Sequence, residues 1–396
     1  MDQPRIYLSV DNCFASKRWT RPSEWMPLIR DLGLSCIEAS ADNECDPFFS
    51  HPEYLDDWTR EIKEWAERTR TRVVTFYSGH GTYATLGLSH TDPRVCDRML
   101  NDWLVAMARR AGSLDAGMGF FTHAFPLSVL NDPARYHAAC EALFGRLALL
   151  ARAAHEHGVT TAGVEQMYTP HQVPWTVEGA RHLLREVVRR AGTPFYVTID
   201  TGHMTGQQRF LRPDTDALLK CLARMKQGAH ESAFWVGPDP VRDAFVALVG
   251  RPECEWEDGV RRIQQGMDRF AYAFAAATDG DPYQWLRELG RYSPIIHLQQ
   301  TDGRSSSHRP FNDEWNAKGI IDGPRVLRAL AESYSKSRES GMPPPCTNLY
   351  LTLEVFSGTS DQPAEILDRM RDSVTYWRRY IPTDGLTLDE LIRRLQ

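Results

Sequence analysis

Short apolar runs and longer amphipathic runs alternate along most of the chain. The apolar runs are rich in β-branched and aromatic residues and are bounded by polar, glycine or proline residues, as expected of buried parallel strands. They predict eight strands, at 6–10, 36–40, 72–77, 117–121, 160–165, 195–200, 295–298 and 349–355. The amphipathic runs that follow the strands predict helices at 22–34, 51–69, 92–112, 132–157, 176–191, 323–337 and 362–380.

This alternation favours one α/β fold, the (β/α)₈ TIM barrel. Strands that alternate with helices are typical of parallel βα units, and eight such units close into a barrel. Local signals support the helix starts, since Asp92 is a suitable N-cap and Pro93 fits the first helical turn. We expect a single barrel over residues 1–384 and a short tail helix over 385–396.

The interval between the sixth and seventh strands is far longer than one crossover helix needs. It contains three further helix-like runs, at 215–227, 239–250 and 256–278. We therefore expect a long helical insertion at about 206–292. It would cover the mouth of the barrel or mediate contact between subunits.

The composition is that of a globular protein with a full core, and it argues against some classes of binding partner. Hydrophobic residues make up 42% and charged residues 25% of the chain, which are ordinary values for a globular protein. The net charge of -6 disfavours nucleic-acid binding, and no run approaches the roughly 20 apolar residues that cross a bilayer. We expect a cytoplasmic protein without nucleic-acid or membrane partners. Its eight cysteines are scattered without a CxxC pair, so we assign them no role in the chemistry.

Polar residues at the C-terminal ends of the predicted strands indicate where the chemistry lies, because barrel active sites form at that end. Glu165 and Asp200 end the fifth and sixth strands, His297 lies in the seventh, and Glu354 lies near the end of the eighth. Any one of them could cap the next helix. Four at one end are hard to explain separately, because a buried carboxylate needs a partner. Together they form an oxygen-rich set that suits Mn²⁺, Mg²⁺ or Co²⁺, with Zn²⁺ also open.

Other residues should face the same mouth and contact the substrate. Glu38, His80 and His123 each follow or end an apolar strand. The segment 303–310 follows the seventh strand and holds three serines and two arginines. That combination could bind a phosphate or could form a solvated loop.

At these residues the chain resembles the xylose isomerase-like barrel superfamily. The resemblance is to its branch of sugar isomerases and epimerases, which includes ketose 3-epimerases and inositol-catabolism enzymes. Members carry a Glu at the fifth strand, an Asp followed three residues later by a His at the sixth, a His at the seventh and a Glu at the eighth. The corresponding residues here are Glu165, Asp200 with His203, His297 and Glu354.

Two further positions resemble the family more loosely. Arg304 matches by approximate position an arginine that contacts substrate in many members. His308 and Pro310 resemble the family's His-x-Pro, although several extra residues intervene before Gly319. The resemblance implies that Arg304 and His308 bind substrate. It also implies that His203 binds a substrate hydroxyl or tunes the sixth-strand ligand.

The resemblance implies an isomerase of carbohydrate metabolism that acts on a small sugar or sugar phosphate. A divalent metal, Mn²⁺ as first choice, would stabilise an enediolate as a Lewis acid. Glu165 and Glu354 would be both metal ligands and the groups that take and return the proton. Because many such barrels are dimers or tetramers, we also expect a homo-oligomer.

Three alternatives remain open at this point. The same chemistry could expel a hydroxyl, as in a lyase or dehydratase acting on an inosose or a dehydroshikimate-like ring. An abasic-site endonuclease would use a three-zinc cluster on the same barrel. However, the chain lacks the expected Asp-x-His pair, because Ser306 stands two residues before His308. A barrel that has lost its activity and serves as a binding module is the third alternative.

Overall fold

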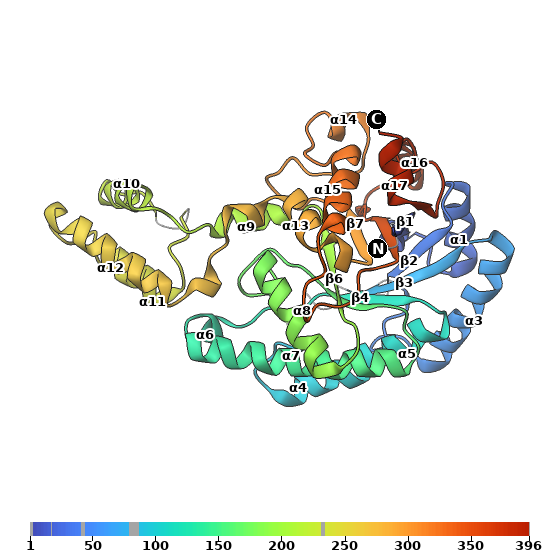
Figure 1. Ribbon diagram of the computed structural model, residues 1–396, viewed down its shortest axis with the longest axis horizontal. Coiled ribbons are helices and arrows are strands. Elements are labelled where there is room, and N and C mark those ends of the chain that lie inside the picture. The colour runs from blue at the N-terminus through green and yellow to red at the C-terminus, as the bar shows by residue number, and fades with distance from the viewer. Residues whose placement is uncertain (1–2, 17, 41–43, 79–86, 231–233, 396) are drawn as a thin grey trace.

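The computed structural model describes residues 3–16, 18–40, 44–78, 87–230 and 234–395. Its centre is one sheet of parallel strands, shown in Figure 1: β1 (Arg5–Asp11), β2 (Cys36–Ser40), β3 (Arg72–Ser78), β4 (Gly117–Phe120), β5 (Ala162–Glu165), β6 (Tyr196–Asp200), β7 (Ile295–Leu298) and β8 (Asn348–Leu353). Neighbours in the chain are neighbours in the sheet, and β1 pairs with both β8 and β2. The sheet is therefore closed, and the predicted (β/α)₈ barrel is confirmed.

The strands are buried over nearly their whole length. All residues of β2, β4, β5, β6 and β7 are buried. Side chains on one face fill the barrel and those on the other pack under helices, which explains the near-continuous apolar runs in the sequence. Polar side chains inside the barrel therefore need partners within the protein.

Each strand is followed by helical segments outside the barrel: α1 (Pro22–Asp31), α3 (Pro52–Thr69), α4 (Pro93–Arg98) with a π-helical stretch (Met99–Val105) and α5 (Ala106–Ser113), α6 (Leu127–Leu130) with α7 (Pro133–Glu156), α8 (Val177–Ala191), α14 (Asp313–Asn316) with α15 (Gly323–Ser335), and α16 (Pro363–Arg378). As expected, Asp92 caps α4 by accepting a hydrogen bond from the Arg94 amide. Asp132 caps α7 in the same way.

The C-terminal end of the chain packs onto the barrel. A short strand, β9 (Leu386–Thr387), pairs antiparallel with β1. The helix α17 (Leu388–Arg393) follows within the stretch where a tail helix was predicted, and it contacts α15. No helix among the described residues is both long and apolar enough to span a bilayer.

The long interval between β6 and β7 has two parts. The helices α9 (Met204–Gln207), α10 (Thr215–Lys226), α11 (Asp239–Val246) and α12 (Trp256–Asp268) lead away from the barrel, and Figure 1 shows α10, α11 and α12 as an arm at one side. This arm has its own apolar cluster, which includes Leu222, Phe245 and Val260. The helix α13 (Pro282–Leu289) instead contacts α8, α15 and β6, so it occupies the sixth place in the ring of barrel helices.

The arm joins the barrel at a narrow neck where its two ends meet. Leu211, on the way out, forms a parallel bridge with Ala275, on the way back, and the Ala275 amide donates to the Phe210 carbonyl. The indole of Trp235 donates to the Ala273 carbonyl beside this bridge. Residues of the neck are thereby held close to the C-terminal ends of β5, β6 and β7.

Candidate metal centre and substrate pocket

Four polar residues meet inside the C-terminal end of the barrel. Glu165 and Asp200 are the last residues of β5 and β6, His297 lies in β7, and Glu354 directly follows β8. One ligand atom from each lies within 4.8 Å of the others, and all four residues are buried. The register explains part of this arrangement, since Asp200 of β6 pairs directly with His297 of β7.

His297 is held between carboxylates on both sides of its ring. Its Nε2 lies 2.7 Å from Glu38 Oε1, and its Nδ1 lies 3.1 Å from Glu165 Oε1. A proton on Nε2, donated to Glu38, leaves the lone pair of Nδ1 directed at the four-residue group. A carboxylate that fixes the tautomer of a ligating histidine in this way is common at metal sites.

Glu38, for which a substrate contact is predicted, lies against His297 in this structure. It is fully buried, and its second oxygen accepts a hydrogen bond of 2.7 Å from the Thr75 hydroxyl. Glu165 is supported in a similar way by Tyr77, whose hydroxyl donates to Glu165 Oε2 and whose ring packs edge-on against His297. Tyr77 has no distinguishing signal in the sequence, because it looks like any aromatic residue of a buried strand.

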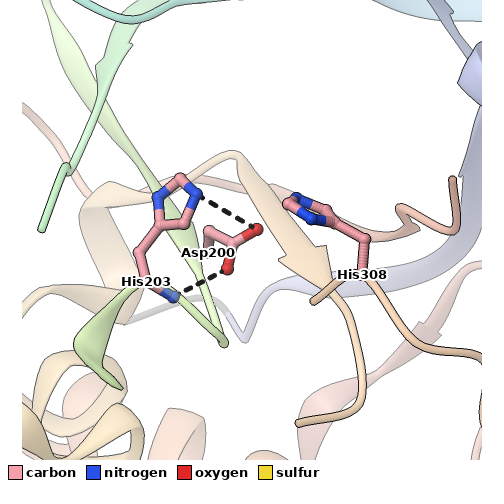
Figure 2. Close-up of side chains that lie close together, drawn as sticks. All are labelled: Asp200, His203 and His308. Atoms are coloured by element: carbon pink, nitrogen blue, oxygen red, sulfur yellow. Dashed lines mark hydrogen bonds and ion pairs between the residues drawn. The ribbon is translucent and has the colours of Figure 1, made fainter. Parts of the chain in front are cut away.

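A second group shares Asp200 with the first. Figure 2 shows the Asp200 carboxylate between the rings of His203 and His308. The amide of His203 donates to Asp200 Oδ1 at 3.0 Å, and the Nε2 of the same ring lies 4.0 Å from Oδ2. His308 reaches the first group as well, because its Nε2 lies 3.4 Å from Glu354 Oε2.

Gln299 is a site residue that sequence reasoning missed. Its amide nitrogen donates to both oxygens of Asp200, at 2.8 and 2.9 Å, and its Oε1 accepts from the His308 amide at 2.7 Å. A Cβ on Gly202 would lie 2.4 Å from the Gln299 side chain, so a glycine is needed there. The available signal was spacing, because residues two apart on a strand point to the same side and Gln299 is two after His297.

The electrostatics of the centre favour a bound cation. Among the described residues, the carboxylates of Glu38, Glu165, Asp200 and Glu354 form ion pairs with histidines only. Glu354 Oε2 is buried and makes no hydrogen bond with a described residue. A buried group of carboxylates without lysine or arginine is costly unless a metal ion or protons neutralise it.

The pKa shifts reflect the same excess of negative charge. Burial and the neighbouring carboxylates of Asp200 and Glu165 raise the pKa of Glu354 well above its usual range. Burial alone would lower the pKa of His297, but the carboxylates of Glu354 and Glu38 raise it well above its usual value. Without a cation, these raised pKa values mean that bound protons neutralise part of the negative charge. A divalent ion would neutralise it instead. The donor set of three carboxylates and one imidazole fits Mn²⁺, Mg²⁺, Co²⁺ or Zn²⁺.

The remaining predicted substrate residues lie at different depths. His123 is buried, neither ring nitrogen bonds to a described residue, and burial lowers its pKa to about 3. His308 is half-buried, stacks on Phe356, and has a pKa that burial lowers to about 4. Arg304 is exposed and lies farther out, at the rim of a cavity. His80 lies outside the described residues.

That cavity has a volume of about 880 Å³ and lies between the neck of the arm and the loops after β5, β6 and β7. It adjoins the metal-type centre at two points. Tyr168 lines it and packs edge-on against His203, with ring centroids 5.0 Å apart. Ser306 lines it and accepts a hydrogen bond from Gln299, the residue that holds Asp200.

The fold and this centre define a class of protein: a (β/α)₈ barrel with a buried group of carboxylates and histidines at its C-terminal mouth. A family model described as xylose isomerase-like TIM barrel matches residues 26–337, well over half of the chain. The chain belongs to this family, and the resemblance seen in the sequence is confirmed.

Individual relatives point in the same direction. The D-erythrulose 1-phosphate 3-epimerase of Brucella abortus (strain 2308) is 33% identical over 111 residues, which are 28% of this chain and 32% of that relative. The match thus spans about a third of the relative's length.

Solved structures share the fold over nearly the whole chain. A Rhodospirillum rubrum protein provisionally described as a xylose isomerase has a TM-score of 0.65 and 16% identity, with 94% of this chain and 99% of that one covered. An L-ribulose 3-epimerase has a TM-score of 0.56 and 14% identity, with 98% and 97% covered. A D-psicose 3-epimerase has a TM-score of 0.53 and 13% identity, with 94% and 98% covered.

Proposed function

We propose that this protein is a divalent-metal-dependent epimerase or isomerase of a sugar or sugar phosphate, with Mn²⁺ as the first choice of metal. The observation that carries the proposal is the convergence of Glu165, Asp200, His297 and Glu354 on one buried point. The epimerase relative and the family support the same chemistry.

In the proposed mechanism, these four residues would hold a divalent ion, which would supply Lewis-acid stabilisation of the negative charge that develops on the substrate. Glu165 and Glu354 reach the centre from β5 and β8, which are not neighbours in the barrel. One carboxylate takes the proton from the carbon beside the carbonyl, and the electrons of that C–H bond form an enediolate. The other returns a proton from the opposite side, which inverts the carbon. The hydrogen bond from Tyr77 holds Glu165 in position for its part.

The direct test is a screen of ketoses and ketose phosphates with Mn²⁺ in deuterated water, followed by NMR. The expected result is deuterium at the carbon beside the carbonyl, without loss of water. Glu165→Gln and Glu354→Gln should each lower kcat by 100-fold or more, since a positioned acid or base contributes about 10²–10⁴-fold. Glu257→Gln, an exposed residue of α12, is the matched control and should leave kcat unchanged. Exchange that persists unchanged in both site variants would overturn the assignment of these two carboxylates.

Two other activities are separable by experiment. A dehydratase acting on an inosose or a dehydroshikimate-like ring would release water in the same NMR assay. The group of Asp200, His203 and His308 is the observation that favours a second ion and thus an abasic-site endonuclease. Nicking of an abasic DNA duplex by the zinc-loaded protein, together with about three zinc ions per chain, would replace the sugar proposal.

We also propose a homo-oligomeric, cytoplasmic enzyme that binds neither nucleic acid nor membrane. The net charge of -6 supports the absence of nucleic-acid binding. Light scattering coupled to gel filtration tests the oligomeric state, and a monomer at all concentrations would contradict it.

A further inference from the structure

The cavity between the arm and the barrel has an unusual charge for this protein. The whole chain carries more acidic than basic residues, 52 against 46. Among the residues that the structure describes, the lining of the cavity nevertheless includes three arginines, Arg209, Arg212 and Arg304, and no aspartate or glutamate. Arginine side chains gathered in one cavity attract anions, because their guanidinium charges add up there.

Two of these arginines are available for a ligand. Arg212 is engaged, since it forms an ion pair of 2.6 Å with Asp268 on α12. The guanidinium groups of Arg209 and Arg304 make no ion pair or hydrogen bond with a residue that the structure describes. They come from separate parts of the chain, Arg209 from the start of the insertion and Arg304 from the loop after β7.

Hydroxyl groups complete an anion-binding surface beside them. Ser305 and Ser306 follow Arg304 and line the same cavity. Ser306 Oγ accepts a hydrogen bond of 2.9 Å from Gln299, which leaves its own proton free to be donated to a ligand. Guanidinium groups with adjacent hydroxyls are a favourable environment for a phosphate group.

The cavity is also connected to the proposed reaction centre. Tyr168 and Ser306 are shared between the cavity wall and the shell around His203 and Asp200. A short phosphorylated ketose could therefore place its phosphate among the arginines and its reacting carbons at the four ligand residues. The lining also includes the rings of Phe210 and Trp235, which pack edge-on against each other and offer an apolar surface that suits the carbon chain between the two ends.

We infer that Arg209 and Arg304 form a phosphate subsite, so that the substrate is a phosphorylated sugar and the insertion supplies half of its recognition. The inference rests on the proposed function for the identity of the reaction. It gives the neck of the arm a role in specificity, since Arg209 and Phe210 reach the cavity only because the insertion leaves the barrel at this point.

Binding of matched ligands to the Mn²⁺-loaded protein tests this subsite without requiring turnover. Isothermal titration would use D-erythrulose 1-phosphate, D-erythrulose and inorganic phosphate. The variants are Arg209→Gln and Arg304→Gln, with Arg224→Gln as control because it is an exposed arginine of α10 outside the cavity lining. Circular dichroism checks that each variant folds, which is expected because neither cavity arginine has a bond to lose within the described residues.

We expect the wild-type protein to bind the phosphorylated ketose at least 10-fold more tightly than the free ketose. Each cavity variant should lose about 10-fold or more in affinity for the phosphorylated ketose and for phosphate, and less than 2-fold for the free ketose. Arg224→Gln should behave as wild type. Equal wild-type affinity for both ketoses, no binding of any probe, or an equal loss in Arg224→Gln would overturn the subsite.

Experiment can separate the phosphate subsite from the epimerase reaction, because each can be absent without the other. Deuterium exchange on a free ketose, with no preference for the phosphorylated form, retains the epimerase and removes the subsite. Arginine-dependent phosphate binding without exchange on any ketose phosphate retains the subsite and removes the epimerase.

Discussion

Glu38 offers a sharp test of how the centre is held together, because it contacts His297 without belonging to the four-residue group. The hydrogen bond between His297 Nε2 and Glu38 Oε1 is 2.7 Å long, and both side chains are fully buried. A hydrogen bond to a charged partner contributes about 1.5–3 kcal/mol, and one between neutral partners about 0.5–1.5 kcal/mol. Glu38→Gln keeps an acceptor oxygen but removes the charge, so about 1–1.5 kcal/mol of support for the imidazole should be lost.

This loss corresponds to about 10-fold weaker metal binding, since 1.4 kcal/mol is a factor of ten. Glu38→Ala removes the whole interaction and leaves the His297 N–H without a partner. It should therefore weaken metal binding by about 100-fold, the upper end of effects seen for such supporting residues. Thr75→Val, which removes only the donor to the far oxygen of Glu38, should have the smallest effect.

Titration of Mn²⁺ into the metal-free proteins measures these affinities directly. The predicted order is wild type, Thr75→Val, Glu38→Gln and Glu38→Ala, from tightest to weakest. Wild-type affinity in Glu38→Ala, alongside lost binding in Glu165→Gln, would refute the argument that Glu38 orients His297. If the alanine variant does not fold, the comparison of Glu38→Gln with Thr75→Val still decides the point.

Three further predictions concern stability and the metal. Glu44 is buried, and burial raises its pKa to about 8 although the indoles of Trp25 and Trp58 donate to it. Because the pKa of Glu44 is higher in the folded than in the unfolded protein, its protonated form adds to the free energy of unfolding. This contribution is complete below about pH 4.5 and is lost as pH rises through about 8, by up to about 5 kcal/mol in total. Glu44→Gln should flatten the dependence of urea unfolding on pH between 5 and 8, and an unchanged slope would contradict this. Gln299→Leu should weaken Mn²⁺ binding by about 10-fold in the same titration, because two hydrogen bonds to Asp200 are lost, and unchanged affinity would count against that role. Mn²⁺ at about 1,000 times its Kd should stabilise the wild-type protein by about 4 kcal/mol, seen as a higher Tm, and should leave the Tm of a Glu165→Gln and Glu354→Gln double variant unchanged; an equal rise in both proteins would place the ion elsewhere.

The barrel was predictable because its sequence signal is local and repeated. Buried parallel strands are apolar on both faces, and Asp-Pro pairs such as Asp132 and Pro133 mark helix starts. The role of α13 was not predictable in this way. Its pattern resembles that of the arm helices before it, and only its contacts with α8 and α15 show that it belongs to the ring.

Some site residues also have a local signal in the sequence, whereas others are recognised only from their contacts in the fold. Polar residues that end apolar strands, such as Glu165 and Asp200, stand out in a sequence because their burial there is otherwise unfavourable. Tyr77 and Gln299 do not stand out, because a tyrosine or glutamine near a strand end has many ordinary explanations. The place of Arg209 could not be foreseen, since it depends on how the neck of a long insertion folds back over the mouth.

Elemental analysis of the purified protein tests whether Glu165, Asp200, His297 and Glu354 hold a metal ion, by comparing the wild type with a Glu165→Gln and Glu354→Gln double variant. We expect about one divalent ion per wild-type chain, with Mn²⁺ restoring exchange of the substrate proton after chelation, and loss of that ion in the double variant. Three zinc ions per chain, or an ion retained in full by the double variant, would contradict it.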